Sequence, residues 1–305
     1  TFDLAGQLAL PYLRAHFEAV QAALVHTLPE NQHVLHGPLR RILTAPSKRL
    51  RSGLVIASAA PSRINQTIIA ACTAIELLHL ASLVHDDIMD EAETRWGSPT
   101  VSGKEGVNVA ILVGDYLFAQ AMLQAANISQ KAAEIVATAY TGLCDGQARE
   151  LAEIFNIERS LRSYQAAISG KTAALMSAAC QLGGLCAGLS AAQVSALASY
   201  GQHFGMTFQI IDDILDLISS TQLTGKPVGN DIKEGVYTMP VIFGLAGPNR
   251  GTIVQHLRSK APSGMVVPLL IAEGSIKQAT KQAQNRGQWA AWARGSCAKN
   301  AIRKG

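Results

Sequence analysis

One segment restricts the possible folds of this chain more than any other, namely residues 66–93, QTIIAACTAIELLHLASLVHDDIMDEAE. Its apolar residues recur at helical spacing, and near the centre they occupy almost every side of the predicted helix. A helix of this length makes about seven turns. Because a helix that is apolar all round must be covered by neighbouring elements, this segment predicts a buried core helix.

Other parts of the chain carry the same helical pattern, and we find no segment of useful length that alternates as a strand does. Glycine- and proline-containing stretches such as residues 95–106 and 224–231 separate them. No Pro/Ser-rich linker divides the 305 residues. We therefore predict an all-α fold with a single domain over residues 1–305. The further helical segments are residues 8–28, 108–127, 130–155, 161–184 and 190–219.

The composition agrees with a largely buried helical assembly, since 48% of the residues are hydrophobic, 5% aromatic and 16% charged. The formal net charge is +4. Residues 250–305 hold ten Lys or Arg and one acidic residue, a net +9, so the preceding residues sum to −5.

The five cysteines form no CxxC pair, which favours reduced thiols. With no secretory leader pattern at Thr1, we expect a cytoplasmic protein.

Two acidic clusters with identical spacing contrast with this low overall charge. Each continues an apolar helix and has aspartates at i, i+1 and i+4, so its first and third members stack one turn apart. Like charges at this spacing repel, and burial raises the pKa of such groups, so a cation must offset them. The clusters consist of Asp86, Asp87 and Asp90, and of Asp212, Asp213 and Asp216.

Carboxylates without cysteine or histidine partners favour a hard cation. Mg²⁺ suits best, because it completes its octahedral shell with water and phosphate oxygens. Two such clusters facing each other across a cavity would bind a diphosphate through bridging metals, whereas either cluster alone is also consistent with a solvated acidic helix face. Several basic residues would then grip the diphosphate, although each by itself is more typical of a protein surface. They are Lys48, Arg49, Arg51, Arg95, Lys171 and Lys226.

With these motifs the chain resembles the trans-type isoprenyl (polyprenyl) diphosphate synthases from about Lys48 to Pro240. SKRLR is similar to the family's GKxxRP box, and HDDIMDE and FQIIDDILD are similar to its two aspartate-rich motifs. GKT lies between those motifs, and GKPVGNDIKEG follows the second, as in the family. The resemblance implies a bundle of antiparallel helices around a deep central cavity, usually as a homodimer.

The resemblance also implies a reaction, in which an allylic prenyl diphosphate ionises and condenses with isopentenyl diphosphate, and a proton is then eliminated. It assigns all six aspartates to Mg²⁺, with Asp86, Asp87, Asp90, Lys171, Asp212 and Asp213 as catalytic residues. Phe208 and Gln209 would border the reacting allylic carbon. Arg95, Lys171, Thr172 and Lys226 would hold the allylic diphosphate, and Lys48, Arg51 and His79 would hold isopentenyl diphosphate.

Two positions depart from the family pattern. Trp96 stands where a second arginine usually contacts isopentenyl diphosphate, and Val236 stands where a lysine usually lies near the allylic diphosphate. Smaller differences are Ser47 and Ser52, in place of the usual Gly and Pro of the first box. These losses leave two alternatives open: a class I terpene synthase-like lyase that ionises a preformed prenyl diphosphate, and a regulatory partner subunit of another synthase.

Ala81 and Ser82 precede the first acidic cluster by one turn and are small. In the family, bulky aromatic residues here form the floor of the product tunnel, so we expect a product of C20 or longer.

The basic C-terminal segment, with Trp289 and Trp292, is typical of a terminal helix pair with a solvated basic face. Peripheral contact with an anionic membrane for product release stays open, and nucleic acid is not expected because no reader motif accompanies the charge.

Overall fold

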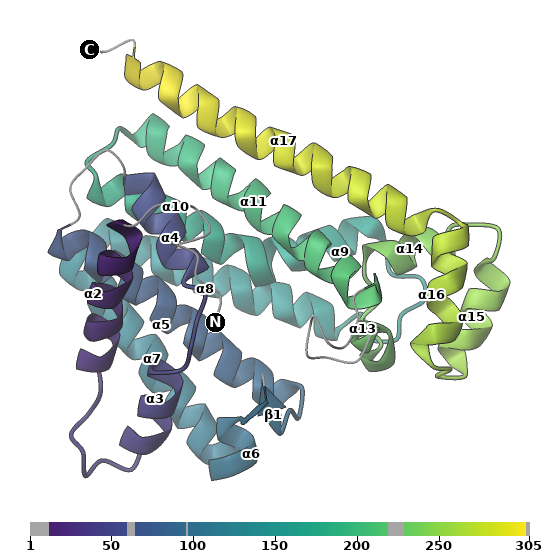
Figure 1. Ribbon diagram of the computed structural model, residues 1–305, viewed down its shortest axis with the longest axis horizontal. Helices are drawn as coiled ribbons and strands as arrows, with labels where there is room; N and C mark the ends of the chain where they lie inside the picture. The colour runs from purple at the N-terminus through teal and green to yellow at the C-terminus, as the bar shows by residue number, and fades with distance from the viewer. Residues whose placement is uncertain (1–11, 60–64, 96, 219–228, 303–305) are drawn as a thin grey trace. The chain divides into compact units, whose positions relative to one another are not determined.

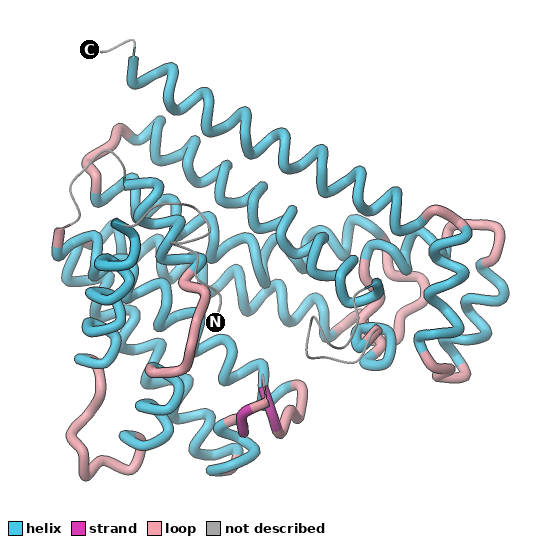
Figure 2. Tube along the Cα trace, in the orientation of Figure 1, coloured by secondary structure: helices cyan, strands magenta, loops and turns pink. Residues whose placement is uncertain are grey.

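The computed structural model describes residues 12–59, 65–95, 97–218 and 229–302, and the side chains of residue 12 and of residues 289–302 are not described. Apart from one pair of two-residue strands, the regular elements of this part of the chain are helical (Figures 1 and 2), which confirms the all-α prediction. The chain divides into two compact units, and the boundaries fall within helices α8, α10 and α11. Unit 1 comprises Thr1–Tyr140 and Leu175–Ala198, and unit 2 comprises Thr141–Ala174 and Ser199–Gly305. The single domain stays a prediction.

The described residues form the following elements in chain order. Up to residue 128 they are α2 (Tyr12–His26), α3 (His36–Leu43), α4 (Leu50–Ala59), α5 (Gln66–Met89), β1 (Thr94–Arg95), β2 (Ser98–Pro99), α6 (Val101–Glu105) and α7 (Val107–Ile128). The later elements are α8 (Gln130–Leu151), α9 (Leu161–Ile168), the π-helical turn η1 (Ser169–Ala173), α10 (Ala174–Cys186), α11 (Ala191–Ile218), α13 (Asn230–Glu234), α14 (Met239–Leu245), α15 (Arg250–Arg258), α16 (Ser263–Ala272) and α17 (Ser275–Ile302).

Helix α5 is the predicted core helix of unit 1, and it ends at Met89, before the predicted end at Glu93. Glu91 takes a left-handed conformation with a φ of +49°, and the Ala92 N–H donates to the Asp87 carbonyl at 2.9 Å. This bond spans five positions and is one of the two hydrogen bonds that define a Schellman-type helix end. The chain therefore turns away at the first acidic cluster, and the prediction of a helix through residue 93 was wrong at this end.

Helix α7 lies alongside α5 in unit 1 (Figure 1). A Cβ at Gly114 would lie 2.1 Å from His85 Nε2, so glycine at this position leaves room for the His85 ring between the two helices. Among the described residues, α5 and α7 are the two helices long and apolar enough to cross a membrane. The most apolar part of α5 is 72% buried, as in the core helix of a globular protein, whereas that of α7 is only 33% buried.

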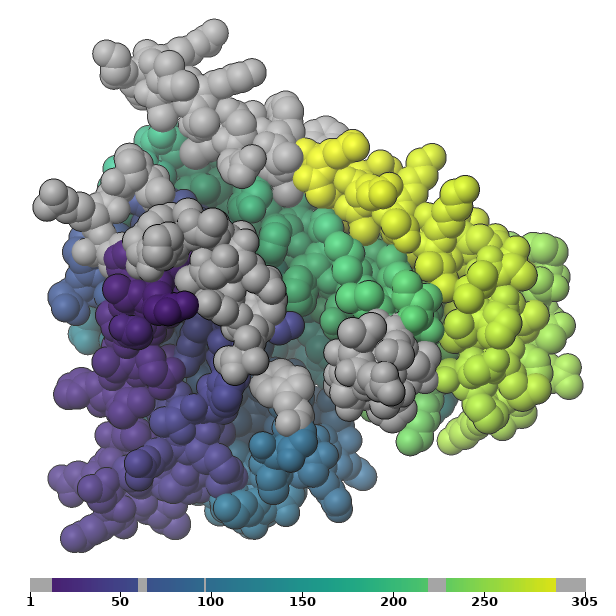
Figure 3. Space-filling view, viewed as in Figure 1, coloured from purple at the N-terminus to yellow at the C-terminus, as the bar shows by residue number. Residues whose placement is uncertain are grey.

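Unit 2 has its own buried core. One part of it is built on α9, α11, α14 and α17, and includes Tyr164, Ile210 and Met239. A second part surrounds Tyr237 and Leu270. Helix α14 packs against α15, α16 and α17, which form the green-to-yellow part of the molecule (Figures 1 and 3). This core supports the carboxyl-terminal half of α11, which carries the second acidic cluster.

Candidate active site

The first acidic cluster lies at the end of α5. Asp87 is 6% exposed, and the Arg95 Nε donates to its Oδ1 at 2.7 Å. Asp90 is exposed and Asp86 is partly exposed. Arg95 is positioned by the short β1–β2 pair, in which it is the partner of Ser98. The middle aspartate therefore points inward to an arginine, while the outer two, one turn apart, present carboxylates on an accessible face.

Three arginines of unit 1, Arg49, Arg51 and Arg95, act electrostatically on the partly buried His79. Burial lowers the pKa of His79 well below its usual value, and the nearby Arg51, Arg95 and Arg49 lower it further. Burial also lowers the pKa of Arg51 to about 10, an effect that the Glu76 carboxylate partly offsets. Within the described part of the chain, the buried Arg51 Nε has no hydrogen-bond partner. Grouped cations with an unmet buried donor are suited to bind an anion such as a diphosphate.

The second acidic cluster, on α11 in unit 2, has the same layout with different partners. Asp213 is 4% exposed, whereas Asp212 is exposed. The Tyr164 hydroxyl donates to Asp213 Oδ2 at 2.5 Å, and Gln209 Nε2 donates to Oδ1 at 2.9 Å. Burial raises the pKa of Asp213 to about 7, although these two hydrogen bonds lower it. Thr172 Oγ1 donates to Gln209 Oε1 at 2.5 Å, so two predicted substrate-binding residues orient this aspartate.

The third aspartate of this cluster meets the start of α13. The backbone N–H groups of Asn230 and Asp231 donate to the two carboxylate oxygens of Asp216, each at 3.3 Å. Burial raises the pKa of Asp231 well above its usual value, and Asp213, Asp216 and Glu150 raise it further. Unit 2 therefore gathers more carboxylates than the motif alone suggests, which makes this region a strong candidate for binding a cation.

Lys171 lies on the π-helical turn η1, which interrupts the helix predicted over residues 161–184. A Cβ at Gly146 would lie 2.2 Å from the Lys171 backbone nitrogen, so the turn packs directly on the backbone of α8. The Lys171 Nζ donates to Glu150 Oε1 at 2.6 Å. Single π turns inside helices are frequent at functional sites. This one carries both Lys171 and Thr172.

The clusters fit a hard divalent cation. Among the described residues, no group of three or more His, Cys, Asp and Glu side chains could hold a metal ion. Mg²⁺ does not require such a group, because water and substrate phosphate oxygens complete its shell. Both clusters lie at the C-terminal ends of their helices, where the helix dipole adds negative potential. The geometry favours the accessible Asp86, Asp90 and Asp212 as ligands, whereas both carboxylate oxygens of Asp216 accept backbone N–H groups from α13.

The roles assigned to individual residues stay predictions. Lys48 is exposed, and Phe208 is 40% exposed. Ala81 and Ser82 are buried, and the Ser82 hydroxyl donates to the His79 carbonyl at 2.8 Å. Lys226 and Trp96 lie outside the described residues, as do the side chains of Trp289 and Trp292.

Sequence reasoning missed four acidic or phenolic groups of these sites: Glu76, Glu150, Tyr164 and Asp231. Glu76 could have been found as a charged residue in the middle of an apolar helix. Asp231 could have been found because it lies in the sequence that follows the second motif. Glu150 and Tyr164 meet their partners only through the fold, at sequence separations of 21 and 49 residues.

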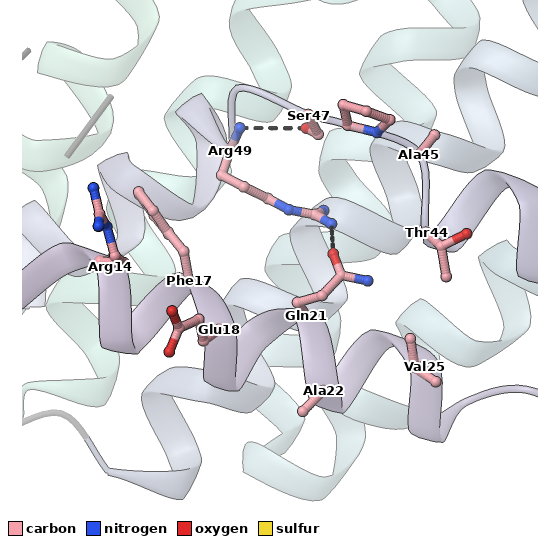
Figure 4. A pocket seen from close by; sticks show the side chains of 11 residues that line it. Arg14, Phe17, Glu18, Gln21, Ala22, Val25, Thr44, Ala45, Ser47 and Arg49 are labelled. Carbon is pink, nitrogen blue, oxygen red and sulfur yellow. Dashed lines mark hydrogen bonds between the residues drawn. The ribbon is translucent and has the colours of Figure 1, made fainter. Parts of the chain in front are cut away.

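A cavity of about 760 Å³ in unit 1 lies between α2 and the segment that leads into α4 (Figure 4). Phe17, Val25 and Pro46 give it apolar walls, and Gln21 and Arg49 contribute polar groups. None of the acidic-cluster residues lines it, so we do not assign it to the reaction.

The sequence model of the polyprenyl synthetase family matches residues 32–268. The chain is 32% identical over 271 residues to heptaprenyl diphosphate synthase component 2 of Bacillus subtilis, covering 88% of this chain and 78% of that protein. It is 36% identical over 251 residues to nonaprenyl diphosphate synthase of Mycobacterium tuberculosis, covering 81% and 75% respectively.

Solved structures agree. A polyprenyl synthase from Caulobacter crescentus, complexed with calcium and isoprenyl diphosphate, matches with a TM-score of 0.87 at 27% identity, covering 94% of this chain and 90% of that one. A geranylgeranyl pyrophosphate synthetase from Pyrococcus horikoshii matches with a TM-score of 0.84 at 34% identity, covering 93% and 90%.

The fold and the paired carboxylate-bearing helix ends therefore define a protein of the all-α prenyltransferase class. More particularly, the chain belongs to the polyprenyl synthetase family, which confirms the resemblance seen in its motifs.

Proposed function

We propose that this chain is a polyprenyl diphosphate synthase that joins isopentenyl diphosphate to an allylic prenyl diphosphate, with Mg²⁺ as cofactor. The observation that carries the proposal is the repeated helix end, with an accessible aspartate at i and an inward aspartate at i+1 that is held by a side-chain donor. Relatives named for heptaprenyl and nonaprenyl products support a product of C20 or longer. The small, buried Ala81 and Ser82 agree with that length.

The chain's own residues account for binding and orientation. Arg95 and Lys171, with Lys226, would hold the allylic diphosphate, and Lys48, Arg51 and His79 would hold isopentenyl diphosphate. Bound Mg²⁺ would supply positive charge that stabilises the leaving diphosphate.

In the proposed reaction the allylic C1–O bond breaks, and its electron pair leaves with the diphosphate. The isopentenyl double bond then attacks C1, which forms the new carbon–carbon bond. The departed diphosphate accepts the proton that is eliminated. No side chain acts as a nucleophile, and the cation must be shielded from water, which would convert it to an alcohol.

The direct test is incubation with Mg²⁺, an allylic diphosphate and isotopically labelled isopentenyl diphosphate, with products read by mass. Labelled chains lengthened by five-carbon units are the expected result. A hydrocarbon or alcohol made without isopentenyl diphosphate would show the terpene synthase-like lyase that the Trp96 and Val236 departures leave open. No turnover, together with binding to another synthase, would show a partner subunit, a possibility that the "component 2" name of the Bacillus subtilis relative keeps in view.

We also propose a homodimer, supported by the outward face of α7. Val107, Ile111, Leu112 and Leu123 are between 42% and 55% exposed on this helix. Asp115 is its one charged residue, so the face is suited to burial against a second copy. Sedimentation should give twice the monomer mass for the wild type and the monomer mass for Leu112→Asp/Leu123→Asp. A wild-type monomer would contradict the dimer. A cytoplasmic location and peripheral membrane contact stay predictions.

A further inference from the structure

We propose that Glu76 is a positioning residue, which holds the basic box, residues 47–52 (SKRLRS), in the shape that presents Lys48 and Arg51 to isopentenyl diphosphate. The inference rests on the proposed function. Glu76 lies on α5 one turn before His79 and is only 2% exposed. Because a buried carboxylate is strongly unfavourable unless it is paired and hydrogen-bonded, its partners explain its presence on an otherwise apolar helix.

Within the described ranges, the hydrogen bonds to the Glu76 carboxylate all come from the basic box. Arg49 Nη1 donates to Oε2 at 3.0 Å. The Ser52 N–H and the Ser52 hydroxyl donate to Oε1 at 3.1 and 2.8 Å. Ser52 lies in the first turn of α4, where backbone N–H groups have no partner within the helix. Glu76 therefore acts as an N-terminal cap supplied to α4 by another helix.

The Arg49 backbone shows what this anchoring achieves. Its φ is +50°, a left-handed conformation that a residue with a Cβ keeps only when its surroundings hold it. Figure 4 shows the Arg49 guanidinium directed at Gln21 of α2, and the Arg49 N–H donating to the Ser47 hydroxyl at 3.3 Å. Arg49 is thus drawn inward, while Lys48 before it is exposed and Arg51 after it lies close to His79.

Ser52 belongs to this network, and it is also one of the positions that depart from the family pattern, since the family usually has proline at this position. A proline has no N–H and could not donate to Glu76. In this chain the two Ser52 hydrogen bonds supply a restraint at the start of α4 that the proline ring would otherwise supply. The box is held by an ion pair and two hydrogen bonds rather than by a fixed backbone angle.

The test is calorimetric titration of the full chain with isopentenyl diphosphate. Glu76→Gln keeps the size of the side chain and removes the charge that faces Arg49. We expect its Kd to rise about 10- to 100-fold, and that of Ser52→Ala to rise about three- to tenfold. The KM for the allylic substrate should stay within about twofold for both, because that diphosphate is held by other residues. A purely structural role would not produce this split between the two substrates.

Glu105→Gln is the matched control, because it breaks an ion pair with Arg41, at 2.6 Å in the same unit, without touching the box. It should leave the Kd unchanged. If Glu76→Gln binds isopentenyl diphosphate as the wild type does, or if Glu105→Gln weakens binding equally, the positioning role is wrong while the synthase function stands. A wild type that binds no isopentenyl diphosphate would overturn both. If Glu76→Gln does not fold, Ser52→Ala decides: unchanged binding would overturn the proposal.

Discussion

The two acidic clusters share one backbone layout but differ in what their middle aspartates meet. Asp87 is paired with a cation, the Arg95 guanidinium, at 2.7 Å. Among the described residues, the donors to Asp213 are both neutral, namely the Tyr164 hydroxyl and the Gln209 amide. Both are nearly buried, at 6% and 4% exposure.

This difference separates what a motif determines from what its surroundings determine. The i, i+1, i+4 spacing stacks the outer two aspartates and separates the middle one from them, and the middle one lies on the buried side of each helix end. Compensation of its charge depends on residues outside the motif, since Arg95 is 8 positions from Asp87 and Tyr164 is 49 positions from Asp213. The first cluster has its compensating cation built in. Burial raises the pKa of Asp213 to about 7, so the second cluster is the one more in need of a bound cation.

The largest expected effect is on kcat, and it should be the same for both clusters. Asp86→Asn and Asp212→Asn each remove the first outward carboxylate, and each should lower kcat by about 10²- to 10³-fold. Steady-state rates with labelled isopentenyl diphosphate measure this. Glu134→Gln, at an exposed acid on α8, is the control and should keep the wild-type rate. A near-normal rate in either aspartate variant would break the equivalence.

The next effect separates the clusters by stability. Arg95→Met leaves the inward Asp87 without its ion pair, and should lower the free energy of unfolding by about 2 kcal/mol in metal-free buffer. Urea denaturation measures the loss. Arg149→Met, which removes a pair exposed on α8, should cause no measurable change. Equal stability of Arg95→Met and the wild type would mean that Asp87 does not depend on this arginine.

A pH series sharpens the contrast at Asp213. Its pKa of about 7 lies above the value of about 4 in an unfolded chain, so the folded protein binds the proton more tightly. The stability contributed by this group is fully present below pH 4 and falls as the pH rises to 7. Between pH 5 and pH 8 in EDTA, the wild-type Tm should therefore fall by roughly 2–4 °C more than that of Asp213→Asn. Parallel curves for the two proteins would contradict the raised pKa.

The smallest effect concerns the neutral donor. Tyr164→Phe removes one hydrogen bond to Asp213, and should lower the free energy of unfolding by about 1 kcal/mol. The asparagine variant at 213 offers a double-mutant cycle, in which the two losses should not add. If urea denaturation shows that Tyr164→Phe costs more than Arg95→Met, the order drawn from the comparison is reversed.

Much of the fold could be predicted from apolar periodicity, because long buried helices impose it on the sequence. Residues 190–219 correspond to α11, Ala191–Ile218. The π turn at Lys171 could not be predicted, because it depends on how closely Gly146 of α8 approaches it. The end of α5 was missed because Glu91, rather than glycine, takes the left-handed position.

The candidate site was predictable where its residues are contiguous. The aspartates and the basic box lie in short motifs whose spacing has a chemical meaning. The residues that hold these groups in place do not lie in such motifs. Glu76, Glu150 and Tyr164 act through contacts between different helices. A sequence shows the groups that meet the substrate more readily than it shows the groups that hold them.

The central claim is that the substrate diphosphate binds through Mg²⁺ and that the aspartates of each cluster are needed for this binding. The most direct measurement is calorimetric titration with a prenyl thiodiphosphate that resists ionisation, with and without Mg²⁺, for the wild type, Asp86→Asn and Asp212→Asn. The account predicts that tight binding requires Mg²⁺ and that each substitution weakens it by at least about tenfold. Binding that is independent of Mg²⁺, or that is weakened by only one of the two substitutions, would contradict it.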